Sequence, residues 1–237
     1  MFSICIASRG NPLGLWATIH ACQALNVDAE YLVFLNGGAK EESHFLLEER
    51  ANTKIFHSMT PTVPPIARDY LATEAKGDVL CFLDDHVIPV GGFFDPVPCD
   101  VLHTSYQTHR CYQPYYHFVP DRELPTKGDY SKVPLRGTMY PCLSGPHGGF
   151  FVKAEAWKTI GGYGDWFQGF GGEEAYFGWK ARKHGLDVQL DPNRLFYHYS
   201  CRSETRGYEK TINHWNYEEG MRQLGSVKLN ESLWTAH

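Results

Sequence analysis

The sequence predicts an α/β domain built on a mainly parallel central sheet. Short apolar runs of strand length alternate with longer segments that carry helix caps and helix-stopping glycines. The chain has 237 residues, of which 43% are hydrophobic and 21% charged, as is usual for a packed globular protein. Alternating strands and helices favour right-handed βαβ units, which place neighbouring strands in parallel.

In the first half, two helices are expected between four strands. Asn11 can cap the first helix, with Pro12 at its first position, and the second helix is expected over Ile66–Ala75, before Gly77. The strands are predicted at Phe2–Ala7, Tyr31–Leu35, Lys54–His57 and Asp78–Leu83.

Residues 91–147 differ in character, because Pro, Tyr, His and Gly dominate and no periodicity persists. This segment is predicted to be irregular. A strand over Gly148–Lys153, helices over Ala154–Ile160 and Glu173–His184, and a strand over Leu195–Tyr199 are expected to follow. We expect one domain over residues 1–199 and a flexible or lid-like segment over 200–237.

Charge and composition exclude several classes of protein. A net charge of -5 argues against a general duplex-DNA coat, which needs a basic excess. No apolar window has the ~18 residues of a membrane helix, and no signal peptide is apparent, so no membrane anchor is expected. The seven cysteines are odd in number and lack CxxC spacing. Buried free thiols in a cytoplasmic protein are therefore predicted.

Asp84-Asp85-His86 directly follows an apolar run. Ligands bind at the carboxyl ends of parallel strands, where an Asp-x-His pair can hold a divalent cation. The alternative is that the two acids only cap the next turn.

Glu173 and Glu174 begin a predicted helix after a glycine-rich loop. One could act as a general base, or both could only complement the helix dipole. His198 lies in an aromatic strand and His147 lies among glycines, so each is either a ligand or a structural histidine.

Taken in order, these motifs resemble a glycosyltransferase of the GT-A fold. The pattern is most similar to the family 2 enzymes and the polypeptide N-acetylgalactosaminyltransferases, whose metal motif has the Asp-x-His form. The matching segments are Ser3–Asn11, Val33–Gly38, Ile66–Asp69, Phe82–His86, Gly148–Phe151, Gly161–Tyr163, Gly171–Glu174, Trp179–Gly185 and His198. At position 36 the chain has Asn where the family usually has an Asp that reads uracil.

The resemblance implies a metal-dependent hexosyltransferase that moves a sugar from a nucleotide-sugar, most simply a UDP-sugar, to an acceptor hydroxyl. It implies Asp84, His86 and His198 as metal ligands, and imidazole ligands favour Mn²⁺ over Mg²⁺. Glu174 matches the family's base, and Glu173 is expected to bond the sugar or acceptor. The expected nucleotide-binding residues are Ala7, Arg9, Asn36, Arg68, Asp84, Asp85, Arg202 and Arg206.

Two rival functions remain open from the sequence. One is a metal-dependent hydrolase built on Asp84, His86, His147 and His198, and the other is a non-catalytic nucleotide-sugar-binding module. The acceptor is expected to dock across residues 100–145, where aromatic and imidazole rings can stack: Tyr106, His109, Tyr112, Tyr115 and Tyr116. A glycan, a protein side chain, a small metabolite or a hydroxylated nucleobase would fit such a surface.

Overall fold

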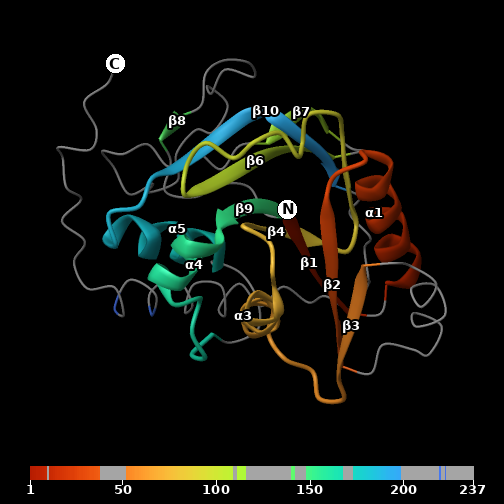
Figure 1. The fold of residues 1–237 in the computed structure, drawn as a ribbon, viewed down its shortest axis with the longest axis horizontal. Coiled ribbons are helices and arrows are strands. Elements are labelled where there is room, and N and C mark those ends of the chain that lie inside the picture. Colours follow the sequence, from red (N-terminus) through yellow and green to blue (C-terminus); the bar gives the residue numbers. More distant parts are fainter. Residues whose placement is uncertain are drawn as a thin grey trace.

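The computed structural model describes residues 1–9, 11–37, 52–108, 111–115, 140–141, 148–167 and 173–198, with residues 219 and 222 (Figure 1). Its helices are α1 (Pro12–Ala24), α3 (Pro64–Glu74), α4 (Ala154–Ile160) and α5 (Glu173–Lys183). Its strands are β1 (Phe2–Ser8), β2 (Ala29–Asn36), β3 (Thr53–Ser58), β4 (Val79–Asp84), β5 (Val87–Pro89), β6 (Val101–Thr108), β7 (Cys111–Tyr115), β8 (Tyr140–Pro141), β9 (Gly149–Lys153) and β10 (Val188–His198).

All of these strands belong to one sheet, with the order β3-β2-β1-β4-β9-β6-β10-β5. β7 pairs with β6, and β8 pairs with β10. Along the main path, β3, β2, β1, β4, β6 and β10 run in one direction, while β9 and β5 run against them. The predicted mixed α/β fold with a mainly parallel sheet is therefore confirmed.

The sheet curls back on itself at the carboxyl end of β4. Only Asp85 and His86 separate β4 from β5, yet β9, β6 and β10 lie between these two strands in the sheet order. β5 pairs with β10 in the antiparallel sense, and Val87 lies opposite His198. This pairing brings the ends of β4 and β10 together.

Helices cover both faces of the sheet, so the core has two parts. On one face, Ala67 and Leu71 of α3, Trp157 of α4 and Phe177 of α5 are buried against the strands. On the other face, α1 and the segment around Phe93 are packed. In Figure 1, α1 is accordingly separated from the other three helices by the strands.

Local signals in the sequence are confirmed at several helix ends. The Asn11 side chain accepts a hydrogen bond of 3.1 Å from the backbone N–H of Gly14, as the predicted cap requires. Gly161 ends α4 with a φ of 71°, in the left-handed region that glycine adopts without steric cost. The described cysteines Cys5, Cys22, Cys81 and Cys99 are free and buried, as expected.

The prediction that residues 91–147 are irregular is wrong for β6, which lies inside the sheet between β9 and β10. Its residues His103, Thr104 and Ser105 are buried although they are polar, so the strand shows no apolar run. The Thr104 hydroxyl donates a 2.8 Å hydrogen bond to the Gly149 carbonyl of β9, which satisfies one such group.

Because β6 lies inside the sheet, residues 101–105, at the start of the expected acceptor surface, belong to the buried core. The backbones of Tyr106, Tyr112 and Tyr115 lie in β6 and β7, whereas His109 and Tyr116 fall outside the described residues. The expectation of a lid over residues 200–237 concerns residues that the structure, apart from 219 and 222, does not describe. No helix in the described part of the chain is long and apolar enough to cross a membrane.

Candidate metal and catalytic site

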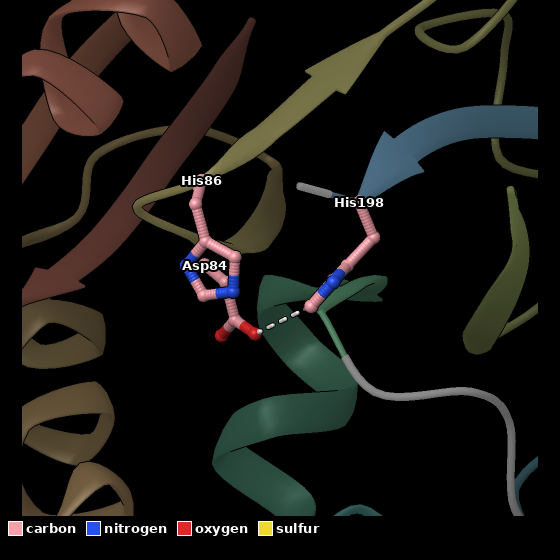
Figure 2. A group of neighbouring side chains, drawn as sticks. All are labelled: Asp84, His86 and His198. Carbon is pink, nitrogen blue, oxygen red and sulfur yellow. Dashed lines mark ion pairs between the residues drawn. The ribbon is translucent and has the colours of Figure 1, made fainter. Parts of the chain in front are cut away.

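Three predicted site residues meet at the carboxyl edge of the sheet. Asp84 is the last residue of β4, His86 lies in the turn that follows, and His198 is the last residue of β10. The parallel run of β4 and β10 places both strand ends at the same edge, as expected for a ligand site in an open α/β sheet. Figure 2 shows the three side chains directed toward one another.

The geometry of this cluster suits a divalent cation. One ligand atom from each of the three residues lies within 4.8 Å of the others. His198 Nε2 is 3.6 Å from Asp84 Oδ2 (Figure 2), and the two imidazole rings are 4.5 Å apart between centroids at an angle of 79°. One carboxylate and two imidazoles form a donor set that fits Mn²⁺ or a similar transition metal better than Mg²⁺.

Gly148 makes room for His198. A Cβ atom at position 148 would lie 2.8 Å from Cδ2 of the His198 ring, closer than van der Waals contact permits. The Gly148 φ of 109° also lies in the left-handed region. Its carbonyl accepts a 3.0 Å hydrogen bond from the backbone N–H of Asp84, so Gly148 contacts both Asp84 and His198.

Asp85 faces away from solvent and contacts neighbouring side chains. Its Oδ1 lies 2.8 Å from Nδ1 of His86, and its Oδ2 accepts a 2.7 Å hydrogen bond from the Ser8 hydroxyl. Ser8 ends β1, beside Ala7, which lies opposite Asp84 in the β1–β4 pairing. Of the expected nucleotide-binding residues, Ala7 thus adjoins the cluster and Asp85 supports it.

Arg68 of α3 joins the cluster to the two acidic residues of α5. Its Nη1 donates a 3.0 Å hydrogen bond to Oε1 of Glu174 and lies 4.0 Å from Oε1 of Glu173. Its Nη2 donates a 3.4 Å hydrogen bond to Oδ1 of Asp84. Arg68, Glu173 and Glu174 are all buried. The structure therefore brings Glu173 and Glu174 into the same buried network as Asp84.

The acidic groups of this network surround one arginine. Asp84, Glu173 and Glu174 are three carboxyl groups around the single guanidinium of Arg68. Burial alone would raise the pKa of Asp84, but the hydrogen bond with His198 and the positive charge of Arg68 hold it well below its ordinary value. Asp84 is thus an anion at neutral pH, in the form that binds a metal.

Asp69 and Tyr163 support the site, and sequence reasoning missed both roles. The Asp69 carboxylate accepts hydrogen bonds from the backbone N–H groups of Tyr163 (2.8 Å) and Gly164 (3.0 Å). This holds the glycine-rich turn after α4 and places the buried Tyr163 ring against Phe177 of α5. The sequence carried a signal for both residues, since Ile66–Asp69 and Gly161–Tyr163 are among the segments that match the family.

Asn36 lies at the end of β2, and its amide is bound within the protein. Nδ2 donates a 2.6 Å hydrogen bond to the Thr62 carbonyl, and Oδ1 accepts a 2.7 Å bond from the Thr62 N–H. Arg9 follows β1 and is exposed. Arg202, Arg206 and His147 lie outside the described residues, so the structure does not place them.

The curled α/β sheet of this chain has the GT-A fold, which it shares with solved glycosyltransferase structures. No family model and no curated protein matches the sequence.

The individual structures that resemble this chain are distant in sequence. A structure of GalNAc-T7 with UDP, GalNAc and Mn²⁺ has a TM-score of 0.70 at 19% identity, and the match covers 94% of this chain and 47% of that one. S. aureus TarS 1–349 in complex with UDP-GlcNAc has a TM-score of 0.65 at 15% identity, covering 98% of this chain and 68% of that one. The chain spans about half the length of GalNAc-T7.

Proposed function

We propose that this chain is a metal-dependent glycosyltransferase that moves a sugar from a UDP-sugar to an acceptor hydroxyl. The observation that carries the proposal is the clustering of Asp84, His86 and His198 at one edge of a GT-A sheet. We assign this activity to a domain over residues 1–199.

Asp84, His86 and His198 would hold the metal ion, and we propose Mn²⁺. When bound, the ion supplies Lewis acidity that neutralises the diphosphate leaving group. Three protein ligands leave coordination positions for phosphate oxygens. The GalNAc-T7 structure holds UDP with Mn²⁺ and a TarS structure holds UDP-GlcNAc, which supports a UDP-sugar as the donor for this fold.

Glu174 is the proposed general base that accepts the proton of the acceptor hydroxyl. It is buried at the first turn of α5 and lies within the network that contains Asp84. Arg68 orients the carboxylate through its 3.0 Å hydrogen bond, while Glu173, at 4.0 Å, is held less directly. A fixed orientation is what a base needs in order to meet a hydroxyl at hydrogen-bonding distance.

The nucleotide is proposed to lie across the ends of β1 and β2, beside Ala7, Arg9 and Asn36. Ala7 and Arg9 lie at the end of β1, which is beside β4 in the sheet, and Asn36 ends β2, which is beside β1. Arg202 and Arg206 remain proposed partners of the diphosphate on charge alone.

Purified protein with UDP, Mn²⁺ or both provides the test of this function. Ligands that bind the folded state raise its stability in proportion to RT ln(1 + [L]/Kd), so UDP with Mn²⁺ should raise the melting temperature more than either alone. A panel of UDP-sugars with Mn²⁺, read by UDP release, then identifies the donor. Asp84→Ala, His86→Ala and EDTA should each abolish turnover, and Asp78→Ala, an exposed aspartate at the other end of β4, should not. Full activity in EDTA would eliminate this mechanism.

A further inference from the structure

We propose that Asp85 is a positioning residue for the metal site, acting by fixing the ring and the tautomer of His86. This inference rests on the proposed function, since it assigns a role within the same metal cluster. Asp85 is the middle residue of Asp84-Asp85-His86, and it is among the residues expected from the sequence to bind the nucleotide, not among the expected metal ligands. It is buried at 5% exposure, directly behind His86.

The two carboxylate oxygens of Asp85 contact different side chains. Oδ1 lies 2.8 Å from Nδ1 of His86, and Oδ2 accepts the 2.7 Å hydrogen bond from Ser8. Among the described residues, the carboxylate therefore engages side chains on both sides, not the backbone N–H groups of a turn. The view of Asp85 as a turn cap does not account for this arrangement.

The chemistry of these groups decides the tautomer of His86. In the contact with Nδ1 the carboxylate oxygen of Asp85 is the acceptor, so we place the proton of the imidazole on Nδ1. Nε2 then carries the lone pair of the neutral ring, and a metal binds that lone pair. Hydrogen bonds from a ligating histidine to a carboxylate are a general means of orienting the ring and strengthening its metal binding.

The first βα unit of the chain holds Asp85 in place. Ser8 is buried at the end of β1, and Asn11 Nδ2 donates a 3.4 Å hydrogen bond to the Asp85 carbonyl. A Cβ atom at Gly14 would lie 2.6 Å from that carbonyl, so α1 approaches the turn closely. Thr18 Oγ1 accepts a 3.1 Å bond from the Val87 N–H just beyond His86. The turn is thus fixed from β1 and α1.

The experiment measures Mn²⁺ binding to the whole purified chain, by calorimetry or electron paramagnetic resonance, in the absence of any substrate. Asp85→Ala should weaken Mn²⁺ binding by ~10–100-fold, the usual loss for an outer-shell partner. Asp85→Asn keeps an oxygen that can accept from Nδ1 and should lose less. Ser8→Ala, which leaves the carboxylate in place without its anchor, should also lose less, and Asp78→Ala is the control.

A second measurement needs neither metal nor turnover. The ¹⁵N shifts of the His86 side chain in metal-free protein should show a proton on Nδ1 in the parent. In Asp85→Ala this preference should be lost, while Ser8→Ala should keep most of it. If Asp85→Ala does not fold, Ser8→Ala and the parent spectrum still decide the question.

The outcomes separate this inference from the proposed function. If the parent binds Mn²⁺ and Asp85→Ala binds it equally well, Asp85 has no positioning role and the metal site itself stands. A parent spectrum with the proton on Nε2 also overturns the inference alone. If the parent and all variants fail to bind Mn²⁺, the proposed function falls, and the inference falls with it.

Discussion

Arg68 of α3 and Glu174 of α5 form a buried ion pair of 3.0 Å between residues 106 positions apart in the chain. The same guanidinium reaches Asp84 at 3.4 Å. Arg68 therefore connects the proposed base to a proposed metal ligand, and the two halves of the site share one positive charge.

Removing that charge should destabilise the protein. Arg68→Met keeps much of the side-chain length but removes the cation beside Asp84 and the buried Glu173 and Glu174. Losing one partner of a buried pair typically costs ~3–5 kcal/mol. Urea denaturation in EDTA measures this loss. A loss below ~1 kcal/mol, the size of an exposed pair, would contradict the buried network.

The same variant should change how the free energy of unfolding depends on pH in the acid range. The folded-state pKa of Asp84 lies below its ordinary value, so this group stabilises the fold above ~pH 4 and the contribution disappears as the pH falls further. Arg68→Met removes one cause of the lowered pKa. We therefore expect the metal-free variant to lose less stability than the parent between neutral pH and the acid range, and an unchanged slope would contradict the pairing.

His198→Ala should raise the Mn²⁺ requirement while leaving the fold intact. His198 is a partly exposed residue at the end of β10 and contacts Asp84 at 3.6 Å, so its loss removes a ligand at the edge of the core. The Mn²⁺ concentration for half-maximal rate should increase by at least ~10-fold, because losing even a residue that only supports a metal ligand typically lowers metal affinity ~10–100-fold. His184→Ala, at an exposed position after α5, is the control. A large drop in melting temperature with an unchanged Mn²⁺ requirement would make His198 a structural residue only.

Glu174→Gln tests the base against the helix-cap interpretation. Glutamine retains an oxygen that can accept from Arg68 but cannot take a proton, so transfer should fall by ~10²–10⁴-fold with UDP-sugar affinity nearly unchanged. A cap role would cost under ~1 kcal/mol of stability and leave the rate intact. Glu173→Gln shares the helix end, the charge and the burial, and is the matched control. Equally small effects at both positions would defeat the assignment.

Asn36→Asp should destabilise the protein although it restores the residue that the resembled family usually carries. An aspartate oxygen would replace the amide nitrogen that donates to the Thr62 carbonyl at 2.6 Å, which puts two acceptors in contact. A buried hydrogen bond lost in this way costs ~1–3 kcal/mol. Urea denaturation, with the exposed Asn193→Asp as control, measures it. Equal stability would mean that the Thr62 contact is not needed.

Local signals in the sequence were sufficient for much of this fold. The Asn11 cap, the apolar run before Asp84 and the glycine after Ile160 all act within one or two turns of chain. The meeting of Asp84 with His198 was implied by the resemblance, and the structure accounts for it because parallel strands end at one edge of the sheet.

Other features depend on contacts between distant residues and leave no local pattern. β6 was missed because His103, Thr104 and Ser105 are polar yet buried, which hides the strand from a hydrophobicity reading. β5 has only three residues, and its pairing with β10 joins positions 87 and 198. The shared use of Arg68 by Asp84 and Glu174 likewise appears only in three dimensions.

The two-residue link between β4 and β5 has a consequence for the order in which the site can assemble during synthesis. Asp84 and His86 leave the ribosome early, but β5 gains its partner only when β10 arrives more than a hundred residues later. A nascent chain that ends before β10 lacks His198 and has only two of the three proposed ligands. Tight metal binding at the proposed site would therefore begin only after β10 has been inserted between β6 and β5, and it would report that these strands have paired.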